Sequence, residues 1–145
     1  MMKVYNSTFE TMLRLLCLLS SAGCKLGKER IILMDFISTF GEKYHIAAEN
    51  LNGEYVANAA ELAARRVRIQ RTLKKMVQLG YVIPEQNNVF FYQISSEGDL
   101  YAQALNSDYA KTYRNAVNRA IQVYSGYTDA QLMMLICGNN GGTEQ

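Results

Sequence analysis

The chain has 145 residues, of which 49% are hydrophobic, so it is long enough for one domain with a substantial core. A net charge of +2 is too small to indicate nucleic-acid or membrane binding by itself. Three cysteines and one histidine do not make a disulfide framework or a zinc site, so we expect reduced thiols and no metal ion or cofactor.

A first helix is predicted to begin at Ser7, because Glu10 three residues later completes a capping box. Its inward stripe recurs at helical spacing and consists of Met12, Leu15, Leu16 and Leu19. Gly23 is expected to end it. The apolar segment MLRLLCLLSSAGC is interrupted by Arg14 and is too short to span a bilayer, so we expect a cytoplasmic protein without a membrane segment.

A second helix is predicted over residues 27–41, with an apolar stripe of Ile31, Ile32, Phe36 and Phe40 and with Gly41 as its stop. The connection that follows runs to residue 58, which is long for a compact domain. It is therefore either functional or contains a short helix of its own, for which residues 45–50 are the candidate.

A third, strongly basic helix is predicted from residue 58, with Asn58 as its cap, to Leu79, with Gly80 following its last turn. Its apolar stripe consists of Leu62, Ile69, Leu73 and Met76. Residues 61–75 carry a net charge of +5, which leaves −3 for the rest of the chain because the total is +2. The positive charge is thus concentrated on one helix.

The basic side chains of this helix fall into two predicted groups. Arg66 points along the apolar arc, so we expect it to be buried and paired, with Asp35 or Glu42 as its candidate partner. The candidates for contact with nucleic acid or an acidic protein surface are Arg68, Arg71, Lys74 and Lys75. The alternative for these four is a solvated face without a partner.

Residues 81–95 are predicted to form a β-hairpin with a turn at 85–88 and with Pro84 on an edge strand. Another helix begins after Ser95. Two further helices are predicted, one capped by Ser107 and one beginning with a capping box of Thr128 and Gln131.

The first of these last two helices has a stripe of Tyr109, Tyr113, Val117, Ile121 and Tyr124. Tyrosine is favoured at protein interfaces because it combines apolar area with a polar tip. The stripe is therefore either a partner interface or a face that packs on the domain's own first helix.

The order helix, helix, basic helix, hairpin, helix is that of a winged helix-turn-helix, a mainly α fold with a small β-hairpin wing. We expect this domain at residues 1–105, a C-terminal helical extension at 106–137 and a flexible tail at 138–145. Truncation after Leu105 is accordingly expected to leave a folded domain.

No catalytic constellation is recognisable, because the lone His45 lies in the long connection without a matching nucleophile and GNNGG neither follows a strand nor begins a helix. We therefore expect a protein that is not an enzyme. Any DNA contact should be weak and mainly to phosphates, since Gln70 and Thr72 are the only neutral candidates for base reading. The long connection before the basic helix also differs from the tight turn of a DNA-reading helix-turn-helix.

Several segments together resemble the small middle components of bacterial ABC-three-component systems, a group that includes the middle subunit of Lamassu anti-phage defence. These segments are FETMLRLLCLLS, DFISTFGEKY, ENLNGEYVANAAELAARRVRIQRTLKKMVQLGYV, FFYQISSEG and SDYAKTYRNA. The likeness spans about residues 6–135, and its most specific part is the Asn-Leu-x-Gly loop that leads into an Ala-Arg-Arg helix.

The resemblance implies a non-catalytic adaptor that bridges an SMC-like ABC ATPase and an effector, often a nuclease. It makes the long connection and the tyrosine-bearing helix candidate interfaces, with Tyr44, Leu51, Gly53, Tyr55, Tyr109, Tyr113 and Tyr124 as the residues. The competing hypothesis is a homodimeric winged-helix transcription regulator that binds DNA.

Overall fold

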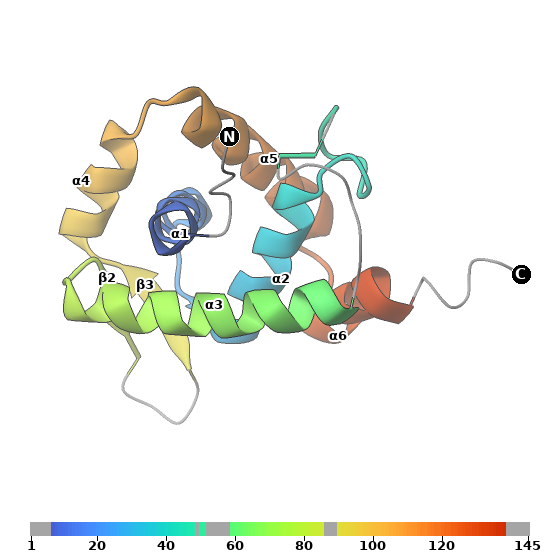
Figure 1. Cartoon of the computed structure of the whole chain (residues 1–145), viewed down its shortest axis with the longest axis horizontal. Coiled ribbons are helices and arrows are strands. Elements are labelled where there is room, and N and C mark those ends of the chain that lie inside the picture. Colours follow the sequence, from blue (N-terminus) through green and yellow to red (C-terminus); the bar gives the residue numbers. More distant parts are fainter. Residues whose placement is uncertain (1–6, 49, 52–58, 86–89, 139–145) are drawn as a thin grey trace, which may run out of the picture.

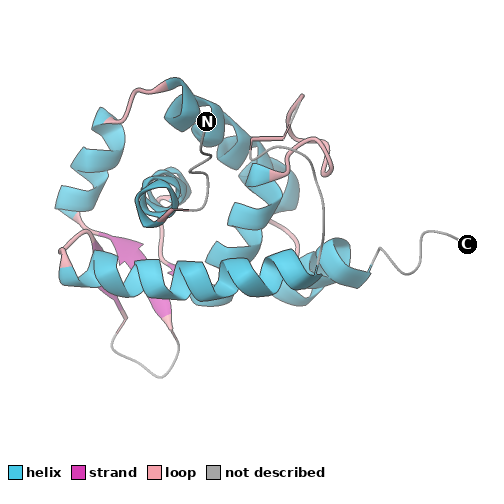
Figure 2. Cartoon of the chain, in the orientation of Figure 1, coloured by secondary structure: helices cyan, strands magenta, loops and turns pink. Residues whose placement is uncertain are grey.

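A computed structural model describes residues 7–48, 50–51, 59–85 and 90–138 of the chain. In this part of the chain the fold is mainly helical, with one small antiparallel sheet (Figure 2). Figure 1 looks along α1 (Thr8–Ala22), which lies in the middle of the molecule. Around it are α2 (Lys28–Thr39), α3 (Ala59–Gln78), α4 (Ser96–Ala104) and α5 (Asp108–Tyr124), all of which contact it. The short α6 (Asp129–Met133) and a π-helical turn, η1 (Met134–Gly138), follow α5.

The central position of α1 follows from its apolar sequence. Its five residues from Leu15 to Leu19 are all almost fully buried, and Cys17 among them is a free core thiol. The predicted ends are confirmed, since the Ser7 side chain accepts a hydrogen bond from the Glu10 backbone N–H and Gly23 adopts a left-handed φ of 69°. A left-handed residue favours glycine because a side chain would clash there.

Helix α2 is buried over its last nine residues, Ile31 to Thr39, because it packs between α1, α3, α5 and α6. It ends at Thr39, two residues before the predicted stop at Gly41. Gly41 has a different role, since a Cβ atom there would lie 2.7 Å from the Cβ of Ala47. Glycine at this position lets the following residues fold back closely against the helix end. The described residues 40–48 form turns and bends, so the part of the candidate helix at 45–50 that lies among them is not helical.

The sheet has the strand order β1-β3-β2 and is antiparallel throughout. β2 (Val82–Pro84) and β3 (Phe91–Ile94) are the predicted hairpin, with Val82 opposite Ile94, and most of its predicted turn lies outside the described residues. Pro84 is on an edge strand, as predicted, because β2 has β3 as its neighbour and, among the described residues, no strand on its other side. β1 (Leu26–Gly27) was not predicted, since two residues are too few to show an alternating pattern.

Helix α5 contributes to the same core as the N-terminal helices. Tyr113, Val117, Ala120 and Tyr124 belong to one hydrophobic cluster with residues of α1, α2 and α3. The predicted caps of this region are confirmed, with Ser107 before α5 and a reciprocal capping box between Thr128 and Gln131 before α6. One hydrophobic core therefore crosses the predicted boundary at residue 105, which is a physical reason to expect that residues 1–105 do not fold alone.

Truncation after Leu105 should therefore destroy the cooperative fold. It removes three large buried side chains of α5, those of Tyr113, Val117 and Tyr124. Each contributes about 1.5–3 kcal/mol to stability when buried. The total stability of a typical domain is only about 5–15 kcal/mol. Circular dichroism melting curves of the truncated and full chains would measure this. The control is truncation after Gly138, which removes residues 139–145 of the predicted tail and should leave the melting curve unchanged. These seven residues lie outside the described part of the chain. A cooperative melt near the full chain's Tm for the shorter protein would restore the original two-part division.

Candidate functional site

The six basic residues of α3 separate into an inner and an outer group. Arg65, Arg66 and Arg68 each contact a carboxylate of the same chain. Arg71, Lys74 and Lys75 are exposed, and no ion pair joins them to any residue in the described part of the chain. The three arginines of the inner group form ion pairs within the chain, whereas the three cations of the outer group are accessible to other molecules.

The predicted role of Arg66 is correct in one respect and wrong in two. Arg66 is paired, but its partner is Glu29 at the beginning of α2 rather than Asp35 or Glu42, with Nη2 donating to Oε2 at 3.1 Å and Nη1 to Oε1. Its side chain is 30% exposed, so it is not buried. The buried arginine is its neighbour Arg65, whose side chain is 1% exposed. The predicted apolar stripe of α3 is confirmed, because Leu62, Ile69, Leu73 and Met76 are all buried. What differs from the prediction is which of the two arginines beside the stripe points inward.

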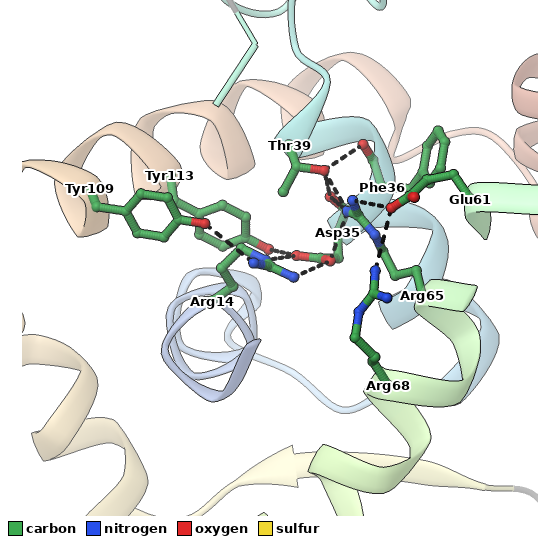
Figure 3. A network of polar contacts seen from close by, with 9 residues as sticks. All are labelled: Arg14, Asp35, Phe36, Thr39, Glu61, Arg65, Arg68, Tyr109 and Tyr113. Carbon is green, nitrogen blue, oxygen red and sulfur yellow. Dashed lines mark hydrogen bonds and ion pairs between the residues drawn. The ribbon is translucent and has the colours of Figure 1, made fainter. Parts of the chain in front are cut away.

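Asp35 is the centre of a buried polar network that Figure 3 shows in close-up. Arg14 of α1 holds both carboxylate oxygens, from Nε to Oδ1 at 2.9 Å and from Nη2 to Oδ2 at 3.3 Å. Arg65 of α3 donates to Oδ2 at 3.1 Å, and the Tyr113 hydroxyl of α5 donates to Oδ1 at 2.7 Å. One carboxylate of α2 is therefore bound by three other helices, and Arg14, Asp35, Arg65 and Tyr113 are almost completely buried.

Arg65 makes further contacts that fix its guanidinium. It donates to the Asp35 carbonyl at 3.2 Å and to the Thr39 hydroxyl, and its Nη2 donates to Glu61 at 3.1 Å. Its guanidinium carbon lies 5.2 Å from the ring centre of Phe36, within the range of cation–π attraction. Glu61 is only partly buried and also accepts from Arg68 at 3.4 Å, so it connects the buried network to the surface.

The network remains ionised at physiological pH. Burial would raise the pKa of Asp35, but attraction to Arg14 and Arg65, with their hydrogen bonds and that of Tyr113, holds this pKa below its ordinary value. Burial would lower the pKa of Arg14, but Asp35 outweighs it and raises this pKa. Burial raises the pKa of Tyr109 to about 12 and that of Tyr113 well above its ordinary value, so both hydroxyls stay protonated and can donate.

The tyrosine stripe of α5 faces the interior of the chain. Tyr113 and Tyr124 are buried, and the Tyr124 hydroxyl donates to the carbonyl of Tyr44 at 3.1 Å. Tyr109 is half-buried and its hydroxyl accepts from Arg14 at 3.2 Å. Tyr44 is buried too. Of the two alternatives for the stripe, packing on the chain's own helices is the one found, because Tyr113 and Tyr124 lie in the core that α5 forms with α1 and α2.

The long connection between α2 and α3 is described only in part, at residues 40–48 and 50–51. Leu51 is partly buried, packs against the core and donates its backbone N–H to the Thr39 carbonyl at 2.9 Å. Gly53 and Tyr55 lie outside the described residues, as does the predicted cap Asn58. The interface role of these residues stays a prediction.

The sequence did not predict that Arg14, Asp35 and Tyr113 form one site. A signal for it was present, because Arg14 interrupts the apolar run MLRLLCLL and Asp35 interrupts the apolar run IILMDFI. Two opposite charges, each inside an otherwise apolar helix, are expected to pair because an isolated buried charge is costly. Tyr113 carried no comparable signal, since a buried hydroxyl cannot be distinguished from an interface tyrosine by spacing.

The described ranges contain neither a candidate metal site nor a candidate membrane span. These residues contain no group of three or more His, Cys, Asp or Glu side chains that could hold a metal ion. Among the same residues, no helix combines the length and the hydropathy needed to cross a bilayer.

Comparison with protein families identifies the chain's relatives. The family described as the ABC-three component (ABC-3C) system Middle Component 2 matches residues 4–142, which is nearly the whole chain. The chain belongs to this family. The resemblance drawn from the sequence is thus confirmed at the level of the ABC-3C middle components. Searches of curated proteins and of solved structures find no match for this middle component.

Replacement of adjacent arginines should distinguish the buried network from the surface pair. Arg65→Ala removes hydrogen bonds to Asp35, Thr39 and Glu61 and leaves a cavity beside Phe36, so it should lower the free energy of unfolding by about 3–5 kcal/mol. Arg66→Ala removes only a partly exposed pair with Glu29 and should cost about 0–1 kcal/mol. Urea denaturation of the two variants measures both values, and equal losses would contradict the inward orientation of Arg65.

The contribution of Asp35 should depend on pH in one direction. Its folded pKa lies below the unfolded value of about 3.9, so its stabilising effect is complete above that pH and is lost as the pH falls through the folded pKa. The stability difference between wild type and Asp35→Asn should therefore be constant from about pH 8 to pH 5 and decrease only below about pH 4. Urea unfolding at a series of pH values tests this. A difference that already shrinks near neutral pH would mean that Asp35 is protonated in the folded protein.

Proposed function

We propose that this middle component is a non-catalytic adaptor that bridges an SMC-like ABC ATPase and a separate effector, such as a nuclease, in a bacterial anti-phage or anti-plasmid defence complex of the Lamassu kind. The observation that carries the proposal is the family match over residues 4–142. A middle component of a three-component system is expected to contact the other components, and its own side chains need no catalytic group for that task. We place its action in the cytoplasm, where such an ATPase would meet foreign DNA.

We further propose that the fold is a winged helix-turn-helix used as an interaction scaffold. The order α1, α2, α3, hairpin supports this. A DNA-reading helix-turn-helix joins its two helices by a turn of about three to four residues. Here residues 40–58 separate α2 from α3, which favours a scaffold adapted for other contacts.

Two of the exposed apolar residues belong to segments at opposite sides of the molecule, and they support a bridging role. Leu100 on α4 is 70% exposed, and Met134, directly after α6, is 65% exposed. Figure 1 shows α4 and α6 at opposite sides of the chain. When a partner covers a large apolar side chain that was exposed to water, the complex is stabilised. Two separated positions of this kind allow two partners to bind at once.

Co-purification with the neighbouring ATPase and effector tests the adaptor. Leu100→Glu and Met134→Glu should each weaken the association with one partner and leave the other bound, because α4 and the turn after α6 lie at opposite sides of the molecule. Gln103→Glu is the matched control for Leu100→Glu, since it adds the same negative charge to an exposed position of the same helix.

The results test two hypotheses independently: the adaptor function itself, and the positions of its contacts with the two partners. If both variants still co-purify with both partners, we would instead place the interfaces at the connection around Leu51 and Tyr55. A protein that recovers no partner and purifies as a homodimer would overturn the adaptor. It would favour the alternative, a homodimeric winged-helix regulator that binds one operator sequence through α3.

A further inference from the structure

We infer that the outer face of α3 is a binding surface for the phosphate backbone of duplex nucleic acid. This surface, the α3 strip, consists of Arg71, Lys74 and Lys75, flanked by Val67 and Gln78. At about 100° per residue these five positions fall within an arc of about 100°. All five except Val67 are polar, and none of them is buried.

The charge of the strip is not neutralised by its own helix. The last acidic residue before the strip is Glu61, and residues 62–78 contain no aspartate or glutamate. Glu61 is already engaged by Arg65 and Arg68, and Glu29 is engaged by Arg66. The strip therefore presents three positive charges to solvent, while the cations on the inner side of the same helix are paired.

Attraction to the helix dipole does not account for all three cations. The negative end of a helix favours positive side chains only within the last turn. Lys75 lies in the last turn of α3, which ends at Gln78, but Arg71 lies about two turns from that end. The dipole therefore accounts for Lys75 but not for Arg71, whereas a polyanion that runs along the helix would contact both.

Phosphate is a better match for the strip than an acidic protein surface. Protein interfaces are depleted of lysine at their centres and depend on buried aromatic or other large apolar side chains. The strip has two lysines, and its single apolar member is Val67. Nucleic-acid backbones are bound by clustered Lys and Arg on a helix face, with amide side chains such as Gln78 as additional donors.

The β2–β3 hairpin strengthens the choice of a duplex. Its strand β2 contacts α3, and Figure 1 shows both strands behind the C-terminal half of α3, the half that bears Arg71, Lys74 and Lys75. A helix with a hairpin at its side can follow the edge of a rigid duplex over more than one phosphate. The strip has no paired amide or guanidinium fork fixed for base reading, so the contact should not depend on sequence.

Fluorescence anisotropy with two labelled duplexes of unrelated sequence tests the inference on the full chain. If three phosphates are contacted, affinity should fall by about 40-fold between about 50 and 200 mM salt, and it should do so equally for both duplexes. In Arg71→Ala with Lys74→Ala, one contact remains and the fall should be only about 3.5-fold. Circular dichroism checks that this variant folds, which is expected because both side chains are exposed.

The matched control is Lys111→Ala with Arg119→Ala, which removes one lysine and one arginine from exposed positions of α5. It should keep the wild-type salt dependence. Equal effects of the two double variants would overturn the inference, because binding would then follow net charge rather than the strip.

Polyglutamate of matched charge provides the second arm. If it competes as well as unlabelled duplex, the surface recognises carboxylates and the inference is overturned in favour of an acidic protein. Co-purification with the ATPase and effector should be unchanged in Arg71→Ala with Lys74→Ala. If the wild-type chain does not bind the duplexes but still co-purifies with the ATPase and effector, only this inference is rejected. If the wild-type chain co-purifies with no partner, the adaptor function is rejected.

Discussion

The fold depends on one buried carboxylate. Asp35 lies in the middle of α2 and is bound by Arg14 from α1, Arg65 from α3 and Tyr113 from α5, so four helices converge on two oxygen atoms. Each of these groups would be costly to bury alone, and each partner becomes acceptable only when the others are in place. The helices therefore cannot slide or rotate past one another independently, since any shift would leave a charge in the core without its partner.

This constraint also decides which way α3 faces. Leu62, Ile69, Leu73 and Met76 define an apolar centre from which Arg65 and Arg66 are both displaced by about 50°, on opposite sides. Hydrophobic periodicity alone cannot choose between them. The choice is made by Asp35 and Thr39, which accept hydrogen bonds from Arg65, and it is supported by the burial of Thr72 on the Arg65 side. Arg66 is then left at the edge, where Glu29 at the beginning of α2 pairs with it.

The parts of the fold that sequence could predict are those with local causes. Ser7, Ser107 and Thr128 begin helices because their side chains satisfy backbone N–H groups a few residues away, and that chemistry is visible in the sequence. β1 could not be predicted, since two residues acquire their strand geometry only by pairing with β3. The direction of the tyrosine stripe was equally undetermined, because a ring that fills the core and a ring that meets a partner obey the same spacing. Arg14 and Asp35 are intermediate: each was visible as an anomaly, but their pairing depends on how α1 and α2 cross.

The charge distribution of the middle component follows from the same arrangement. Three carboxylates pair with the arginines on the inner side and flanks of α3. Asp35 pairs with Arg65, Glu29 pairs with Arg66, and Glu61, at the beginning of α3, pairs with Arg65 and Arg68. Because Arg65 points to the centre of the molecule, Arg71 and Lys74 point away from it on the opposite side of the helix. A chain with a small net charge thereby acquires one face whose positive charge is not compensated locally. The buried network sets the rotation of α3, and that rotation in turn determines which cations another molecule can reach.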